Sequence, residues 1–165
     1  MSVQNEFAYA RSQGWLEAFA GAGARYGFTP ALLMAIASRE TNMRNIIGDR
    51  GHGYGLMQID AGTDPEFCHS GQWRNAALGI SRGANILAQK RDQIEHLVGR
   101  SCLVGGYHFI GKAGAPIAVT IAAYNCGLWA YYNFSCGRNP DTSTTGHNYS
   151  RDVLGRMAQF AELLK

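Results

Sequence analysis

The feature that most restricts the fold is a glycine-dense segment from Gly48 to Gly62, which lies between two helix-forming stretches. Glycine weakens a helix by about 1 kcal/mol relative to alanine, and it adopts left-handed backbone conformations without steric strain. Such a density of glycine stops a helix and favours tight turns or a small hairpin. We therefore expect a small β-hairpin element near residues 48–60, with helix on both sides of it.

The rest of the chain shows mainly the apolar spacing of helices. A first helical region is expected over residues 4–26. Thr29 and Pro30 then supply an N-cap and a first-turn proline for a helix that runs to Glu40. Further helices are expected over residues 75–98, 116–127 and from about 149 onward, and loops over 99–115 and 137–146. The sequence predicts a mainly α fold in one domain over residues 1–165.

Composition excludes several classes of protein. Hydrophobic residues make up 46% of the 165-residue chain and charged residues 16%, which is typical of a folded domain with a core. The longest apolar stretch, around residues 116–124, is too short to span a membrane. The net charge of +3 is spread along the chain, without the basic cluster of a nucleic-acid-binding protein. We expect no nucleic-acid partner, no membrane insertion and a monomer.

The four cysteines are Cys68, Cys102, Cys126 and Cys136, and none of them form a C-x-x-C pair. This spacing disfavours zinc and redox sites, and the five histidines show no metal-ligand spacing, so no cofactor is expected. Four cysteines permit three pairings; we favour Cys68–Cys102 with Cys126–Cys136, and four free thiols are the alternative. Two disulfides would indicate an oxidising compartment. The N-terminal residues show no signal peptide.

Glu40 is the first candidate catalytic residue. It is expected to share a helical face with Leu33 and Ile36, and a glutamate on an apolar face is unusual. Burial raises the pKa of a carboxyl group, which allows the group to stay protonated and to act as a general acid. The alternative is a glutamate at a helix end that pairs with Arg39 or Arg44.

Asp49 and Asp60 flank the glycine segment and are candidate general bases. Inverting glycosidases hold a base about 6.5–9.5 Å from the acid, which leaves room for the attacking water. A hairpin opposite the end of the Glu40 helix would provide such a gap. The alternative is that both are ordinary turn aspartates, because aspartate beside glycine is common in turns.

Four segments in order along the chain resemble goose-type lysozymes, whose superfamily also contains the lytic transglycosylases. They are Ala37-Ser-Arg-Glu40, GDRGHGYGLMQID at 48–60, IAAYNCG at 121–127 and TTGHNYSRDV at 144–153. The matches span residues 37–153. One departure is Cys126, which stands where the family usually has a small alanine.

The resemblance implies the lysozyme-like α+β fold, with helices around a substrate cleft. It implies Glu40 as general acid, and Asp49 with Asp60 as the carboxylates that position and deprotonate water. Further residues fall on family positions that line the sugar sites: Gln58, Tyr124, Asn125 and Tyr149. Tyrosine packs on sugar faces, and amides bind hydroxyl and acetamido groups.

The activity implied is that of a secreted muramidase, which cuts the β-1,4 bond between N-acetylmuramic acid and N-acetylglucosamine in bacterial peptidoglycan, with inversion. A phage lysin made in the cytoplasm is the alternative for the compartment. Lytic transglycosylases, which release 1,6-anhydromuramic acid, usually lack carboxylates at the positions of Asp49 and Asp60. The presence of both aspartates here favours hydrolysis. An inactive glycan-binding module is the second alternative.

Overall fold

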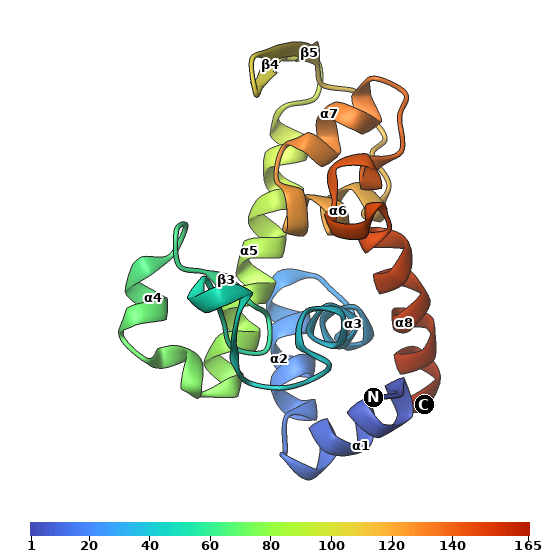
Figure 1. Cartoon of the computed structure of the whole chain (residues 1–165). Helices are drawn as coiled ribbons and strands as arrows, with labels where there is room; N and C mark the ends of the chain where they lie inside the picture. The colour runs from blue at the N-terminus through green and yellow to red at the C-terminus, as the bar shows by residue number, and fades with distance from the viewer. The chain divides into compact units, whose positions relative to one another are not determined.

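The chain folds mainly into helices, and the computed structural model describes all residues from 1 to 165 (Figure 1). The eight α-helices are α1 (Val3–Ser12), α2 (Leu16–Tyr26), α3 (Pro30–Thr41), α4 (Pro65–His69), α5 (Ala76–His96), α6 (Ile117–Cys126), α7 (Trp129–Ser135) and α8 (Tyr149–Leu163). The short strands are β1 (Ile47–Gly48), β2 (Gly53–Tyr54), β3 (Ile59–Asp60), β4 (Ser101–Val104) and β5 (Tyr107–Ile110). This content confirms the predicted mainly α, α+β fold.

The residues form two compact units, which are described here separately. Unit 1 comprises residues 1–85 and 155–165, and unit 2 comprises residues 86–154. Helix α5 begins in unit 1 and ends in unit 2, and α8 begins in unit 2 and ends in unit 1. No helix is both long and apolar enough to cross a membrane.

Helix α3 is the core of unit 1. The Thr29 hydroxyl caps it by accepting a hydrogen bond from Leu32 N (3.2 Å), and Pro30 occupies its first turn, as predicted. Every side chain from Ala31 to Ser38 is buried, so α3 is enclosed on all sides and not only along one apolar stripe. Figure 1 views this helix almost along its axis. It ends at Asn42, whose backbone is left-handed (φ 50°).

The other helices of unit 1 differ from the prediction in two respects: α4 was not predicted, and the N-terminal helical region is divided. The single helical region expected over residues 4–26 is two helices, because the chain turns at Gly14, whose φ of 72° interrupts a right-handed helix. Helix α5 starts as predicted, at an N-cap: Asn75 Oδ1 accepts from Ala77 N (3.0 Å) and Leu78 N (3.3 Å).

The glycine segment forms a three-stranded antiparallel sheet in the order β1-β2-β3. Its register pairs Gly48 with Gly53, and Gly53 with Asp60. The predicted hairpin element near residues 48–60 is therefore confirmed. Residues 55–58, between β2 and β3, also reach α5, because a Cβ on Gly83 would lie 2.6 Å from Met57 Cβ. Only glycine allows this approach.

Unit 2 has an aromatic core beneath a second hairpin. The buried cluster consists of Ile94, Cys102, Phe109, Val119, Ala122, Ala123, Ala130, Tyr131 and Tyr132. The hairpin pairs β4 with β5, and its two-residue turn has positive φ at Gly105 (52°) and Gly106 (84°), which is the conformation of a type I′ turn. The prediction of a loop over residues 99–115 was therefore wrong.

The predicted disulfides are also wrong, because all four cysteines are free thiols. The Cys68 thiol is buried and directed at Ile59 O (3.5 Å), and the buried Cys102 thiol is directed at Arg100 O (3.4 Å). Burial raises the pKa of the Cys126 thiol to about 11. Burial raises the Cys68 pKa as well, with Asp64 and Asp60 adding to the effect. The argument from disulfides to an oxidising compartment no longer stands.

Candidate active site

Glu40 lies half-buried in the last turn of α3, and the next residue attaches this helix end to the glycine segment. Thr41 is buried, and its hydroxyl lies 3.0 Å from Ala37 O and 3.1 Å from Leu56 O. The same oxygen accepts a hydrogen bond from Arg44 N (3.1 Å). The position of the Glu40 backbone is therefore fixed relative to the segment that follows β2.

The Asn45 side chain makes a second set of hydrogen bonds to the segment that follows β2. Asn45 Oδ1 accepts from Leu56 N (3.1 Å), and Asn45 Nδ2 donates to Arg74 O (3.0 Å). Gly55, with a φ of 77°, donates from its own N–H to Ile46 O (2.9 Å). Sequence reasoning missed Thr41 and Asn45 as residues that position the site, because neither stands out by spacing or by composition.

Gln58 is held inside the sheet. Its Nε2 donates to Gly55 O (2.9 Å) and Ile46 O (3.2 Å), and its own backbone is left-handed (φ 49°). Its Oε1 lies so close to Gly48 and Gly53 that a Cβ on either glycine would overlap it. The two glycines are therefore required for the Gln58 side chain to cross the sheet.

Asp49 and Asp60 are exposed carboxylates at the two outer strands of this sheet. Asp60 ends β3, and its Oδ2 accepts from Thr63 N (3.0 Å). Asp49 directly follows β1. Adjacent strands lie about 4.8 Å apart, so two steps across the sheet separate the backbones of Gly48 and Asp60 by roughly 10 Å. The sheet therefore separates the two carboxylates and leaves both open to water.

The backbone at Asp49 is strained. Asp49 (φ 45°) and Arg50 (φ 52°) are consecutive non-glycine residues in the left-handed region. Each such residue costs about 1–2 kcal/mol, and such strain is concentrated at functional sites. The strain therefore supports a functional role for this corner of the sheet.

In unit 2 the structure brings together two of the segments that carry the resemblance. Asn125, near the end of α6, accepts from Thr145 N through its Oδ1 (2.9 Å). Tyr149 N donates to Thr144 Oγ1 (3.3 Å) at the start of α8. Tyr124 is half-buried, whereas Tyr149 is only 1% exposed. Asn125 and Tyr124 thus lie at a surface that the 144–148 turn helps to form.

Asp141 supports that turn, and sequence reasoning missed it. This buried carboxylate accepts from Ser150 N (2.8 Å), Ser150 Oγ (2.8 Å) and Arg151 N (3.2 Å), at the first turn of α8. An acidic group at a helix N-terminus is favourable because it neutralises the orphan N–H donors and the helix dipole. An N-cap is normally sought directly before the helix, and Asp141 lies eight positions before Tyr149.

Unit 1 also contains a cavity of about 330 Å³ beside α4 and the first half of α5. An ion pair between Asp64 and Arg82 lies at its wall, and Asp64 also caps α4 through Phe67 N (3.4 Å). None of the residues predicted for the site line it. No group of three or more histidine, cysteine or acidic side chains is arranged to hold a metal ion.

Comparison with known proteins adds to this geometry. The family model described as "Lysozyme g" matches residues 9–162. The chain belongs to the lysozyme g family. This confirms the resemblance to goose-type lysozymes and makes the chain a glycoside hydrolase of lysozyme type.

Individual members of the lysozyme g family show the same relationship. A lysozyme g of Epinephelus coioides is 32% identical over 146 residues, which cover 81% of this chain and 68% of the relative. A lysozyme g of Gallus gallus is 30% identical over 141 residues, covering 81% of this chain and 57% of the relative. A lysozyme G of Dromaius novaehollandiae is 28% identical, covering 81% and 59%. The chain thus covers between 57% and 68% of the length of these three relatives.

Proposed function

We propose that the protein is a muramidase, which hydrolyses the β-1,4 bond between N-acetylmuramic acid and N-acetylglucosamine in peptidoglycan. One observation supports this most directly. Glu40 lies in the last turn of the enclosed helix α3, and the hydroxyl of Thr41, the final residue of α3, bonds to Leu56 O in the glycine segment. In the same segment Asp49 directly follows β1, and Asp60 ends β3. Inverting glycoside hydrolysis needs a carboxylic acid and a carboxylate base that water can reach, and we assign these roles to the half-buried Glu40 and to the exposed Asp49 and Asp60.

In the proposed reaction, Glu40 donates a proton to the glycosidic oxygen as the bond to the anomeric carbon breaks. Asp49 and Asp60 position a water on the opposite face of the sugar and take its proton as the oxygen attacks. The configuration at the anomeric carbon inverts, because water displaces the leaving oxygen from the opposite side. The exposed aspartates suit this role, since water reaches them directly.

Of the four residues proposed to line the sugar sites, two contact the glycan directly and two support the residues around them. Tyr124 and the Nδ2 of Asn125 contact the glycan directly, since the Oδ1 of Asn125 is already bonded to Thr145 N. Gln58 and Tyr149 act mainly by shaping the site, because the Gln58 Nε2 is bonded within the sheet and Tyr149 is 1% exposed. We propose that residues 1–165 act as one monomeric catalytic domain without a cofactor.

The proposed substrate also bears on the compartment. Peptidoglycan lies outside the cytoplasmic membrane, so the activity requires a protein that is secreted or that is released from the cytoplasm by a phage at lysis.

The reaction products distinguish a muramidase from a lytic transglycosylase. Mass analysis of digested peptidoglycan should show reducing N-acetylmuramic acid ends; products lighter by one water would instead identify a lytic transglycosylase.

The role of Glu40 is tested by Glu40→Gln, with Glu17→Gln as the matched control at an exposed position of α2. The amide has no acidic proton, so we expect turnover of peptidoglycan to fall by a factor of about 10³ or more. Binding to insoluble peptidoglycan and the melting temperature should stay unchanged. Glu17→Gln should keep full activity, and substantial activity in Glu40→Gln would exclude Glu40 as the acid.

Asp49→Asn and Asp60→Asn test the water-activating pair. Each single variant should slow hydrolysis less than Glu40→Gln, because the remaining carboxylate still accepts the proton from water. The double variant should be much slower than either single one. Asp92→Asn, at an exposed position of α5, is the control. Normal rates in the double variant would contradict the inverting scheme.

A further inference from the structure

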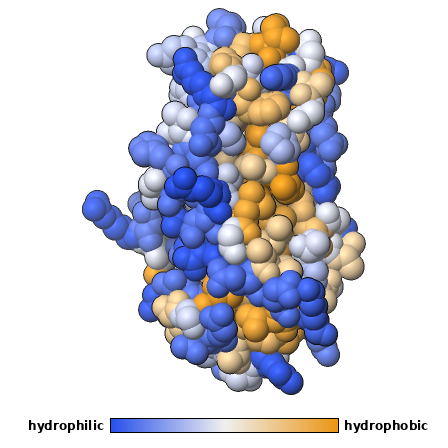
Figure 2. All heavy atoms as spheres, turned by 90° about the vertical axis from the view of Figure 1, so that its right-hand side faces the viewer, coloured by the Kyte–Doolittle hydropathy of each residue, from blue (hydrophilic) through white to orange (hydrophobic).

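The β4–β5 hairpin of unit 2 has one face packed on the core and one face without cover. Cys102 and Phe109 are paired in the register and buried. The opposite face carries Leu103 and Ile110, which are 55% and 62% exposed and are paired in the register with His108 and Ser101. Figure 2 shows that apolar atoms reach the surface on one face of the molecule. Leu103 and Ile110 are two of the three most exposed large aliphatic or aromatic side chains after Met1, and they lie on one face of one hairpin.

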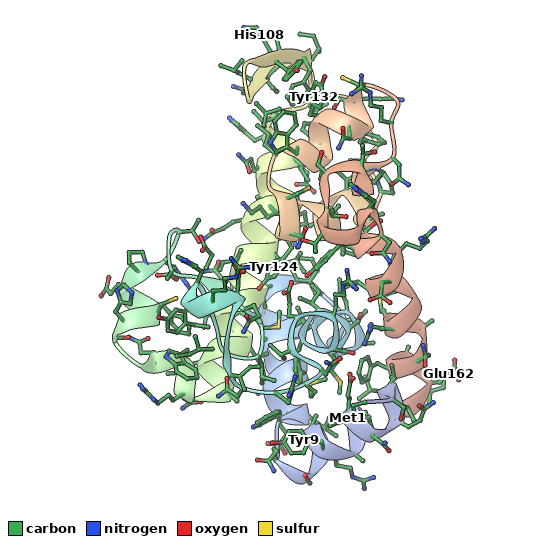
Figure 3. All side chains as sticks on the ribbon, in the orientation of Figure 1. Met1, Tyr9, His108, Tyr124, Tyr132 and Glu162 are labelled. Atoms are coloured by element: carbon green, nitrogen blue, oxygen red, sulfur yellow. The ribbon has the colours of Figure 1, made fainter.

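Aromatic side chains support the hairpin. Trp129 packs so closely on the turn that a Cβ on Gly105 would overlap its ring. The exposed Tyr107 makes ring contacts with Trp129 (5.9 Å between centroids) and Tyr132 (5.8 Å). Figure 3 shows Tyr132 below the hairpin and His108 at its outer side. Tryptophan and tyrosine favour the boundary between an apolar phase and water.

The charge in this part of the chain has a single sign. No aspartate or glutamate occurs from Leu97 to Pro140, whereas Arg100, Lys112 and Arg138 all lie in this stretch and are exposed. Lys112 Nζ lies 5.4 Å from the centroid of the Phe134 ring, and Arg138 Cζ lies 5.7 Å from that of Tyr132. Lys112 and Arg138 are therefore held beside aromatic side chains of unit 2, and Tyr132 is one of those that support the hairpin.

The hairpin is fixed at its base. Tyr131 donates from its hydroxyl to Lys112 O (3.0 Å), and Lys112 N donates to Ser135 Oγ (3.1 Å). Gly111 N donates to Arg100 O (3.0 Å). Because these hydrogen bonds already fix the backbone of the hairpin, binding does not cost the conformational entropy of ordering that backbone.

We propose that the β4–β5 hairpin docks on an anionic lipid surface, lying at the interface and not crossing the bilayer. Leu103 and Ile110 enter the acyl boundary, Tyr107 and Trp129 lie at headgroup level, and Arg100, Lys112 and Arg138 attract the anionic headgroups. A soluble polyanion would neutralise the cations but would leave the aliphatic residues in water. The lipid surface is therefore the partner that accounts for both features, and the inference is independent of the glycosidase activity.

The test is co-sedimentation of the full chain with vesicles of phosphatidylglycerol or of phosphatidylcholine, at low and at high salt. We expect binding to phosphatidylglycerol that weakens with salt, and little binding to phosphatidylcholine. Leu103→Ser with Ile110→Ser should weaken binding by roughly a hundredfold, because the two aliphatic side chains would no longer be buried in the acyl boundary. Leu78→Ser, at an exposed position of unit 1, is the matched control and should bind normally.

Charge is tested separately with Arg100→Gln and Lys112→Gln, which should reduce binding to phosphatidylglycerol and its salt dependence. Melting temperatures of all variants check that they fold. The proposal is overturned if phosphatidylglycerol vesicles do not bind, or if the Leu103/Ile110 variant binds as the native chain does. Equal binding to soluble polyphosphate, unaffected by that variant, would assign the cations to a polyanion instead. A dimer in sedimentation velocity that the variant dissociates would assign the face to a second copy.

Discussion

At the scale of single residues, the candidate site depends on side chains that occupy space left by glycine. The Gln58 side chain crosses the sheet only because Gly48 and Gly53 have no Cβ. Its amide then bonds to Ile46 O and Gly55 O, which holds the turn before β3. Asp60, at the end of β3, is positioned by the same arrangement. The two glycines thus affect the position of Asp60, which we propose as a water-activating carboxylate, through Gln58.

Gly53→Ala tests this dependence. The new methyl group would overlap Gln58 Oε1, so the amide must move and lose its two hydrogen bonds. We expect a loss of about 1–3 kcal/mol in the free energy of unfolding, measured by urea denaturation, and a lower rate of peptidoglycan hydrolysis. Adding Gln58→Ala should recover part of the stability, as a double-mutant cycle would show.

Gly21→Ala is the control for that substitution. Gly21 is exposed in α2, and no heavy atom lies within 4 Å of a Cβ placed there. Alanine should therefore stabilise the protein by up to about 1 kcal/mol, through helix propensity alone. If Gly53→Ala were as harmless as Gly21→Ala, the contact between glycine and Gln58 would not matter for the sheet.

At the scale of secondary-structure elements, the first turn of α8 is held by a side chain that lies outside the helix, in the 140–143 turn. The buried carboxylate of Asp141 receives hydrogen bonds from Ser150 N, Ser150 Oγ and Arg151 N. It also lies 3.3 Å from Thr144 Oγ1, which accepts from Tyr149 N. One acidic side chain therefore joins the 140–143 turn, the 144–148 turn and the first turn of α8.

Asp141→Ala should destabilise the protein by about 3 kcal/mol, because it leaves buried donors without an acceptor and removes the charge at the helix N-terminus. Asp141→Asn keeps one oxygen acceptor and should lose less. Guanidinium denaturation measures both. Asp92→Ala, whose side chain is 64% exposed, is the control and should change stability by less than about 0.5 kcal/mol. A loss below about 1 kcal/mol for Asp141→Ala would contradict this role.

At the scale of the whole molecule, the chain folds without covalent cross-links, since all four cysteines are free. The buried thiols of Cys68 and Cys102 interact with backbone carbonyls and with the apolar cores, and burial raises the pKa of the Cys68 thiol. Cys136 is the exposed member of the set. Stability therefore depends on packing and hydrogen bonds within each unit.

Reaction with a thiol reagent tests whether all four cysteines are free. The denatured protein should react with four equivalents of a thiol reagent, one for each cysteine, and reductant should leave the melting temperature unchanged. In the folded protein near pH 8, Cys136 should be alkylated first. Cys126 should react much more slowly, because its pKa of about 11 keeps the thiolate fraction small. Its rate should rise as the pH approaches 11. Fewer than four thiols after denaturation would contradict the free-cysteine structure.

The sequence determined the features that depend on local chemistry. Thr29 and Pro30 predicted the start of α3, Asn75 lies where α5 was expected to begin, and the glycine segment predicted the small sheet. The ordered motifs also identified the family. Each of these depends on residues that are neighbours in the chain, so short-range propensity and spacing were sufficient.

The tertiary structure decided what depends on residues far apart in the sequence. The enclosure of α3 on all sides, the Thr41 bridge to Leu56 and the Asp141 contacts with α8 follow from packing that no periodicity shows. The β4–β5 hairpin was missed because its strands are short and its turn signal, Gly105-Gly106, also suits a loop. Disulfide pairing was wrong for the same reason: the environment that each thiol meets is set by long-range packing, and cysteine spacing does not contain it.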